Sequence, residues 1–214
     1  MMKVYLIPMI LIFISCNSDK KNTQHNTDTV KNVIKADTIS IVPKANNREN
    51  IISEIKRFRS AMTTKNRNEI LSFFDFPLAD TAVNFFEVDS VFDQKRKLHD
   101  GAITKEMFAG SFDRIYDMTD MLEFNNLFAD MDLELLKDEN SIKKEKRPPN
   151  DGCYYIYLIS IKNNLVYFQY GTNSSDDYRK THPDEEEVCD EYAQMWTFKF
   201  DGKHLKFLKH RIAG

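Results

Sequence analysis

The sequence is poor in residues on which several common functional sites depend. It has six glycines among 214 residues, and none of them forms a Gly-rich phosphate-binding loop. The one continuous apolar run, residues 4–14, is too short for a helix that spans a bilayer. Lys and Arg do not outnumber Asp and Glu, since the formal net charge is −3. The composition therefore argues against a nucleotide-binding loop and against a nucleic-acid-binding protein.

Local catalytic and metal-binding patterns are missing as well. None of the five histidines lies in a recognised motif, and no serine occupies a nucleophile elbow. His182, Asp184 and the glutamates at 185–187 carry imidazole and carboxylate groups, but their spacing matches no zinc or EF-hand template. An acidic loop of this kind is typical of a solvated surface. We therefore predict no catalytic residue, no metal and no cofactor from local motifs.

The N-terminus has the pattern of an export signal. Lys3 precedes the apolar residues 4–14, in the order of the n-region and h-region of a signal peptide. Ser15 and Cys16 follow, and a small residue before a cysteine at this place resembles the lipobox of bacterial lipoproteins. The resemblance implies that Cys16 is lipidated and anchors an exported protein to the cell envelope, in the outer membrane. The alternative is an ordinary secretory signal or an uncleaved anchor, with a buried thiol at Cys16.

Composition divides the rest of the chain in two. Residues 17–47 are rich in Asn, Thr, Lys, Asp and Ser, and such a segment buries too little surface to offset chain entropy. We expect residues 1–16 to be signal peptide and lipobox, residues 17–47 a polar disordered tether, and residues 48–214 a single α+β domain. A domain of that length buries roughly 70% of its unfolded-chain surface, so it needs no metal or disulfide for stability.

Two β-hairpins are predicted at the C-terminal end. Residues 154–161 and 165–170 are dense in aromatic and β-branched residues, and Asn163 and Asn164 between them favour a two-residue turn. Residues 195–200 and 203–212 form the second pair around Asp201-Gly202. With that turn centred, Trp196 is expected opposite Phe207 and Phe198 opposite Leu205.

The residues before the hairpins are mainly helical in pattern. Apolar residues recur at helical spacing from Ile51 to Met62, and a second helix begins at an Asn66 cap. In the middle we predict a short strand at 85–88, a helix that follows Thr104 and continues to Tyr116, and a helix at 120–132. Residues 133–136 are predicted as a strand, and residues 140–152 as a polar loop.

This order of helices and hairpins resembles the nuclear transport factor 2-like (cystatin-like) superfamily. The resemblance rests on residues 48–78 and 153–212 and on pattern alone. It implies helices packed on a strongly curved, cone-like antiparallel sheet. Together, the signal, lipobox, tether and domain look like the exported lipoproteins of unknown role in Bacteroidota.

Two cysteines, Cys153 and Cys189, lie within the expected domain. In a plain meander one strand separates them, which sets them about 9–10 Å apart, beyond the Cα reach of a disulfide at about 7 Å. Pairing requires the loop before Cys189 to fold back over the sheet end. A disulfide and two buried thiols therefore remain open alternatives.

Three classes of function are compatible with the resemblance. A cone-shaped binding module would hold a small apolar ligand, and its candidate lining residues are Phe74, Trp196, Phe198 and Phe207. An envelope protein could instead be the partner of a tyrosine-rich hairpin edge. An enzyme of the isomerase, cyclase or hydrolase type would need a buried Asp or His, and by fold analogy Asp75 and Asp80 are the candidates. We favour a non-catalytic lipoprotein that binds an apolar ligand or an envelope partner and contacts the membrane only through the lipid on Cys16.

Overall fold

The computed structural model describes residues 44–83, 88–148, 152–184 and 189–214. Cys16, the signal peptide and nearly all of the expected tether lie outside these residues, as does most of the strand predicted at 85–88. The helices are α1 (Lys44–Thr63), α2 (Arg67–Ser72), α3 (Ser90–Leu98), α4 (Lys105–Gly110), α5 (Phe112–Met118), α6 (Glu123–Phe128), the 3₁₀ helix η1 (Leu133–Lys137) and α7 (Asp176–Thr181).

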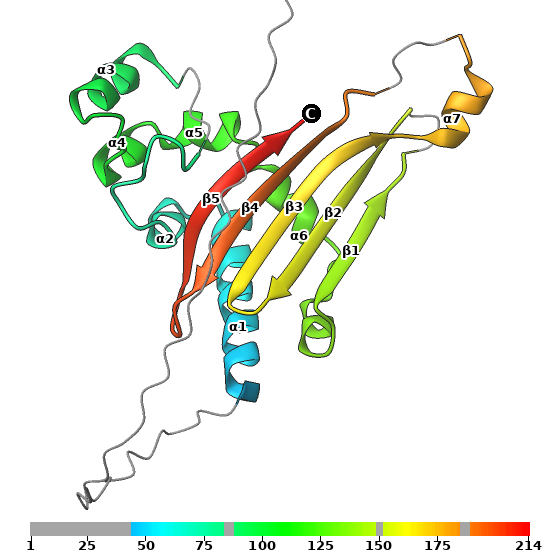
Figure 1. Cartoon of the computed structure of the whole chain (residues 1–214), viewed down its shortest axis with the longest axis horizontal. Helices are drawn as coiled ribbons and strands as arrows, with labels where there is room; N and C mark the ends of the chain where they lie inside the picture. Colours follow the sequence, from blue (N-terminus) through cyan, green and yellow to red (C-terminus); the bar gives the residue numbers. More distant parts are fainter. Residues whose placement is uncertain (1–43, 84–87, 149–151, 185–188) are drawn as a thin grey trace, which may run out of the picture. The chain divides into compact units, whose positions relative to one another are not determined.

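An antiparallel sheet of five strands follows, with the strands in sequence order (Figure 1). They are β1 (Ser141–Lys146), β2 (Cys153–Lys162), β3 (Leu165–Ser174), β4 (Tyr192–Phe200) and β5 (Leu205–Ala213). The predicted turn at Asn163 and Asn164 is confirmed: Lys162 pairs with Leu165, and Asn163 has a positive φ of 57°, which Asn tolerates well. The domain is thus α+β, as the sequence predicts.

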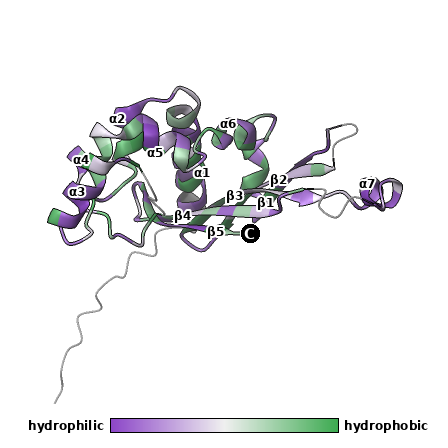
Figure 2. Cartoon of the chain, turned by 90° about the horizontal axis from the view of Figure 1, so that it is seen from above, coloured by the Kyte–Doolittle hydropathy of each residue, from purple (hydrophilic) through white to green (hydrophobic). Residues whose placement is uncertain are grey.

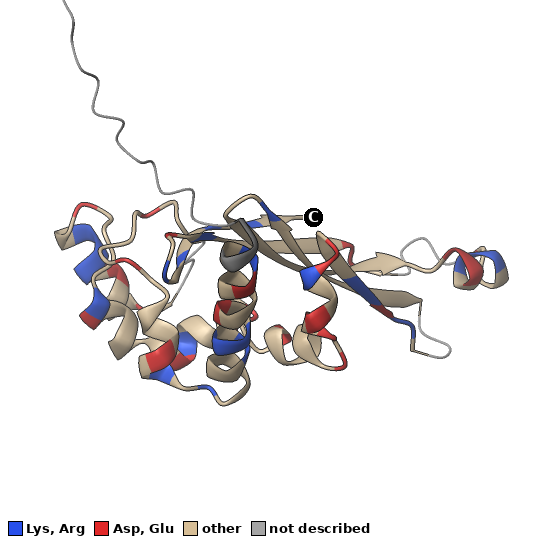
Figure 3. Cartoon of the chain, turned by 90° about the horizontal axis from the view of Figure 1, so that it is seen from below, with Lys and Arg blue, Asp and Glu red and all other residues tan. Residues whose placement is uncertain are grey.

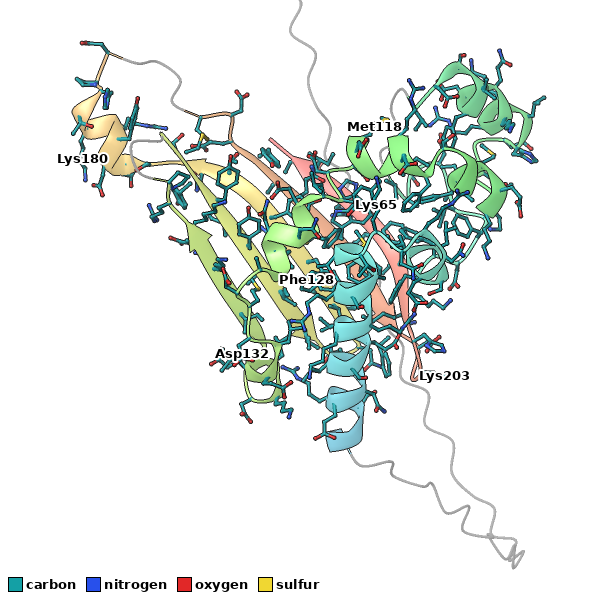
Figure 4. The ribbon with its side chains drawn as sticks, turned by 180° about the vertical axis from the view of Figure 1, so that it is seen from behind. Lys65, Met118, Phe128, Asp132, Lys180 and Lys203 are labelled. Atoms are coloured by element: carbon teal, nitrogen blue, oxygen red, sulfur yellow. A yellow bond between two sulfur atoms is a disulfide. The ribbon has the colours of Figure 1, made fainter. Side chains whose placement is uncertain are left out.

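The helices that cover the sheet lie on one of its faces. Figure 2 shows α1 and α6 on the same side of the strands, and Figure 4 shows both in front of that face, whereas α3 and α4 lie beyond the β5 edge (Figure 1). Phe58 on α1 contacts Phe168 of β3 and Phe198 of β4, with 4.9 Å between ring centroids in both cases. The apolar stripe of α1 packs here, while charged residues of both signs occupy its outer side (Figure 3).

Several predicted elements differ from the structure in the middle of the chain. The helix after Thr104 is two helices, α4 and α5, which meet at Ser111 after the poor helix former Gly110. The predicted strand at 133–136 is the 3₁₀ helix η1, and the predicted polar loop contains β1. β1 is an edge strand, and edge strands carry charged residues that blunt self-association, so its sequence reads as a loop.

The second hairpin has a longer connection than predicted. Phe200 pairs with Leu205, so residues 201–204 form a four-residue loop. The Asp201 carboxylate stabilises it by accepting hydrogen bonds from the backbone N–H groups of Lys203 and His204, both 2.8 Å long. Consequently Phe198, rather than Trp196, lies opposite Phe207. Between the loop and Phe207 the predicted register is wrong by two residues and the faces are unchanged. Beyond the bulge the error is three residues, since Trp196 lies opposite His210, and the faces of β5 are exchanged.

The strong curvature implied by the resemblance is also wrong, because the sheet is not strongly curled (Figure 1). Sharp bending of an antiparallel sheet depends on β-bulges, which kink one strand against its partner. In the described strands the register shifts only once, between Thr197 and Phe198 where β4 pairs with β5. One bulge on an edge strand does not close a sheet into a cone.

Candidate functional site

The four predicted pocket residues lie together in the core. Phe74, Trp196, Phe198 and Phe207 are at most 7% exposed. Phe207 is at their centre, with ring centroids 4.8 Å from Phe74, 5.7 Å from Phe198 and 5.8 Å from Trp196. Rings at these separations are in direct contact. A ligand at this place would therefore have to displace one of them.

Three hollows in the described surface lie elsewhere and are lined mainly by polar side chains. One of about 450 Å³ adjoins Arg48 and Asn164, and one of about 550 Å³ adjoins Arg67 and Lys105. A third, of about 340 Å³, adjoins Asp89. None of the three is lined by the aromatic residues selected from the sequence. These hollows lack the apolar walls typical of a site for an apolar ligand.

Asp75 and Asp80, the candidates for a buried catalytic carboxyl group, lie at the surface. The Asp75 side chain is 67% exposed and pairs with Lys206 at 2.8 Å. The Asp80 side chain is 55% exposed and pairs with Arg96 at 3.2 Å. Exposed ion pairs of this kind contribute little to stability, and neither carboxyl group is buried as the analogy requires. The fold-based assignment of these two residues is therefore wrong.

A different carboxylate, Asp120, reaches the buried face of the sheet. It follows the C-terminus of α5, where the chain must leave the helix, and its φ is +49°. The N–H of Asp120 bonds to the carbonyl of Asp117, and the N–H of Met121 bonds to the carbonyl of Tyr116. This is the hydrogen-bond pattern of a Schellman motif, and Asp is one of the residues that tolerate its left-handed position. The motif aims Asp120 at β4.

Asp120 is the first member of a buried polar network. Gln194 on β4 donates from Nε2 to Asp120 Oδ2 at 2.5 Å, and its Oε1 lies 2.9 Å from His210 Nε2. Trp196 Nε1 donates to the Tyr170 hydroxyl at 3.1 Å, and that hydroxyl donates to the backbone carbonyl of Asp120 at 2.9 Å. Because the Gln194 amide nitrogen is committed to a carboxylate, its oxygen is the acceptor. His210 therefore carries its proton on Nε2.

Burial sets the ionisation of this network. It lowers the pKa of His210 to about 4, so the imidazole is neutral at ordinary pH. Burial also raises the pKa of the Asp120 carboxyl group, with a further rise from the charge of Glu123, although the bond from Gln194 opposes both. Tyr170 has a raised pKa chiefly because it is buried.

The geometry of the network favours a positioning role over catalysis. His210, Gln194, Tyr170 and Trp196 are at most 6% exposed, so no substrate reaches them in this arrangement. Their bonds instead hold the loop around Asp120 against β3 and β4. His210 Nδ1 is buried and has no hydrogen-bond partner in the described part of the chain.

Sequence reasoning missed this network because of one bulge. Strict alternation along β5 places His210 on the same face as Lys206, away from the aromatic residues. The register shift near Thr197 inserts one extra residue, so His210 lies opposite Trp196, and their rings stack with centroids 4.1 Å apart. No local pattern identifies Asp120 either, because its position beside β4 depends on where α5 ends.

Cys153 and Cys189 form a disulfide, with Cα atoms 5.2 Å apart. Cys153 begins β2, whereas Cys189 precedes the start of β4 by three residues. Those three residues cross the end of β3, where Ser174 donates its N–H to the Glu191 carboxylate at 3.1 Å. The loop therefore folds back over the sheet end, which was the condition for pairing.

Comparisons with known proteins assign no family to the chain. No protein-family model, curated protein or solved structure matches it. The likeness to the nuclear transport factor 2-like superfamily therefore remains a prediction from the sequence. Among the described residues, no helix is long and apolar enough to cross a bilayer, and no group of three or more Asp, Glu, His or Cys side chains is arranged to hold a metal ion.

Proposed function

We propose that this chain is a lipoprotein anchored to the bacterial envelope through Cys16, and that its folded domain binds an envelope protein without catalysis. The observation that supports this proposal is the second face of the sheet, which no described helix covers (Figure 2). We call it the outer face. Six half-buried apolar residues on β2, β3 and β4 point to this outer face: Tyr154, Ile156, Leu158, Leu165, Tyr167 and Met195.

The sequence of β2 is that of a strand with cover on both sides. Antiparallel strands with one solvated face alternate apolar and polar residues, whereas strands buried on both faces read as continuous apolar runs. β2 is of the second kind, since Tyr154 and Ile156 on the outer face alternate with Tyr155 and Tyr157 on the inner face. An apolar face without cover is typical of a protein interaction site.

Charge indicates the chemistry of the partner. Lys162, Lys199, Lys209 and Arg211 lie on the outer face or its ends. Lys206, which lies beside them, pairs with Asp75, but these four form no ion pair with a described carboxylate. The chain as a whole carries a net charge of −3, so this surplus of cations is local. The face therefore fits a protein with an apolar surface flanked by acidic residues.

The area of the face is adequate for a specific complex. Four of the strands have nine or ten residues and are about 30 Å long, and β1 has six residues and is about 20 Å long. With about 4.8 Å for each strand, the face covers roughly 700 Å². A standard protein interface buries about 800 Å² on each partner. Tyr and Met are enriched at the centres of such interfaces, and both occur here, as Tyr167 and Met195.

Two other roles are weaker. Binding of an apolar ligand requires the rings around Phe207 to move apart. Enzymatic activity of the isomerase, cyclase or hydrolase type is favoured by one observation, the line of hydrogen bonds from Asp120 through Gln194 to His210. Activity would require a substrate to enter beside Asp120, the most exposed member of that line.

Photo-crosslinking in the host tests the partner face. A benzophenone amino acid at Tyr167 should give one discrete adduct in the full-length chain, and the double variant Lys199→Glu with Arg211→Glu should abolish it. The matched control is the same probe at Leu122, which is 60% exposed on the helical side. Equal adducts from both positions, or an adduct that survives charge reversal, would refute the assignment.

Fractionation tests the anchor separately. Cys16→Ala should release the protein from the membrane fraction, because the lipid is its only proposed attachment to the bilayer. The control is the double variant Cys153→Ser with Cys189→Ser, which keeps the lipidation site. Retention of the Cys16→Ala protein on membranes would show that the lipobox assignment is mistaken.

A further inference from the structure

Two half-buried carboxylates, Asp120 and Glu123, lie next to each other without a basic partner in the described part of the chain. Asp120 is bonded to the Gln194 amide at 2.5 Å. Glu123 accepts from the Asn126 amide at 3.1 Å and from the Tyr157 hydroxyl at 3.1 Å. These donors are all neutral, so the two negative charges remain uncompensated.

Another shielded carboxylate in the domain is treated differently. Glu54 on α1 is 9% exposed and pairs with Arg57 at 2.8 Å. Burial of a charge is costly without an opposite charge, and this pair follows that rule. Lys146, the register neighbour of Tyr155 on the inner face, forms no ion pair with Asp120 or Glu123. The domain therefore supplies a cation to Glu54, whereas no described cation pairs with Asp120 or Glu123.

Three tyrosines, Tyr155, Tyr157 and Tyr192, lie on the inner face of the sheet at this end, and the Tyr157 hydroxyl bonds to Glu123. Tyr155 lies opposite Thr172, and Thr172 lies opposite Tyr192, so the two tyrosines flank a small residue. Tyr157 stacks beside Tyr155 with ring centroids 6.4 Å apart. Tyr155 and Tyr192 are partly exposed, because β2 and β3 extend past α6 at this end (Figure 1).

The ionisation of these groups reflects their shared environment. Burial raises the pKa of Tyr157 and of Tyr192, and the charge of Glu123 raises both further. Asp120 adds to the rise at Tyr192. Tyr157 and Tyr192 are therefore both close enough to Glu123 to sense its negative charge.

We propose that Asp120 and Glu123, together with the rings of Tyr155, Tyr157 and Tyr192, bind an alkylammonium group. Such a group carries a diffuse positive charge with an apolar surface, and both properties match this set of side chains. Aromatic rings attract a cation that lies within about 6 Å of the ring centroid. Tyr155 and Tyr192 are two strand spacings apart, about 9–10 Å, so a group held midway is within reach of both rings.

This site is independent of the outer face and of the anchor at Cys16. It lies on the opposite side of the sheet from Tyr167 and uses none of the four outer cations. Failure of choline binding would therefore not bear on the proposed partner face. The ammonium group has two sources, a free quaternary amine or the lysine side chain of a peptide.

The test is an NMR titration in which choline is added to the full-length chain in a maltoside detergent. Trp196 is the only tryptophan, so its indole N–H gives a single resonance. That N–H is bonded to Tyr170, which is bonded to the backbone of Asp120. We expect a saturable shift of the resonance with choline, and no shift with 3,3-dimethylbutan-1-ol, the neutral molecule of the same shape.

Matched variants decide the assignment. Asp120→Asn retains an acceptor for Gln194 and a residue that tolerates positive φ, so the fold is kept. Loss of one carboxylate should weaken choline binding about tenfold. Glu134→Gln, in which the carboxylate paired with Lys56 and Lys137 is neutralised, should bind choline as the wild type does. Equal binding by Asp120→Asn, an equal response to the neutral alcohol, or no saturable shift would overturn the proposal.

A second titration identifies the source. Nα-acetyl-lysine amide presents a primary ammonium on a flexible stem, whereas choline presents a quaternary one. Tighter binding of choline assigns the site to a free quaternary amine, and tighter binding of the lysine derivative assigns it to a peptide side chain. Absence of binding by both would refute the site.

Discussion

On the helical face of the sheet Phe168 of β3 and Phe198 of β4 are fully buried, whereas Leu158 of β2 and Tyr167 of β3 on the opposite face remain partly exposed. All four side chains are large and mainly apolar, and each pair belongs to two adjacent strands of the sheet. What differs is the cover: α1 and α6 pack on the first face, and no described helix packs on the second. The strand sequence specifies an apolar surface, but only the rest of the chain decides which face is buried.

The comparison also separates two uses of tyrosine. Tyr170 on the inner face is 1% exposed and its hydroxyl is fully engaged with Asp120 and Trp196. Tyr154 on the outer face is partly exposed and lies beneath the guanidinium of Arg147, 3.9 Å from the ring centroid. A buried tyrosine needs a fixed hydrogen bond, whereas the ring of a surface tyrosine can hold a cation.

The largest difference is expected from truncation of a ring on each face. Phe58→Ala removes contacts with Phe168, Phe198 and three further rings, and should lower the free energy of unfolding by about 3–5 kcal/mol. Tyr167→Ala on the outer face should cost about 1 kcal/mol or less. Chemical denaturation of both variants measures the difference. Comparable losses would show that the outer face is covered within the free protein.

The second prediction concerns the disulfide, which joins the start of β2 to the segment before β4. Replacing Cys153 and Cys189 by serine opens a loop with a sequence separation of 36 residues. In the chain-entropy model this lowers the free energy of unfolding by roughly 3–4 kcal/mol. The measurement is denaturation of the double variant against the oxidised wild type. Reduction of the wild type by dithiothreitol should produce the same loss, and a loss below about 1 kcal/mol would contradict the entropic account.

Local sequence patterns made the first two helices and the first hairpin predictable. The apolar spacing from Ile51 to Met62 predicts α1, and the Asn66 cap of α2 is confirmed, since its side chain accepts from the N–H of Glu69. The first hairpin is confirmed because Asn163 supplies its turn. These features depend on residues within a few positions of one another.

The candidate sites were not predictable in this way. Asp120 acts through its place after α5, and His210 acts through a bulge that reverses the alternation of β5. Asp75 and Asp80 were selected by analogy with a cone, which the sheet does not form. The aromatic residues around Phe207 were grouped correctly, but no pattern in a sequence distinguishes a filled core from an open pocket.

Acidification should reveal the buried histidine of the inner face. The native pKa of His210 is about 4, below the unfolded value of about 6.5, so the unfolded chain binds a proton first as pH falls. The stability that depends on a neutral His210 is complete above pH ~6.5 and is lost toward pH ~4, by up to about 3 kcal/mol.

The matched variant for this prediction is His210→Gln, which keeps a donor to Gln194 and removes the titration. The raised pKa of Asp120 acts in the opposite direction, because the native carboxyl group takes up a proton before the unfolded one does. Subtracting the variant's pH profile from the wild type's isolates His210. Parallel profiles between pH 7 and pH 4 would contradict a neutral, buried imidazole.

The smallest effect on stability is expected from the outer cations, and this completes the comparison of the two faces. Lys199→Ser with Arg211→Ser removes two charges that pair with no described carboxylate, so the free energy of unfolding should change by less than about 0.5 kcal/mol. The same double variant should lose the crosslink from Tyr167, because a partner with acidic flanks depends on those charges. A binding face must contain residues that are required for association but contribute nothing to the stability of the isolated domain. A marked loss of stability in this variant would instead place the two cations in the architecture of the domain, and the outer face would then need a different explanation.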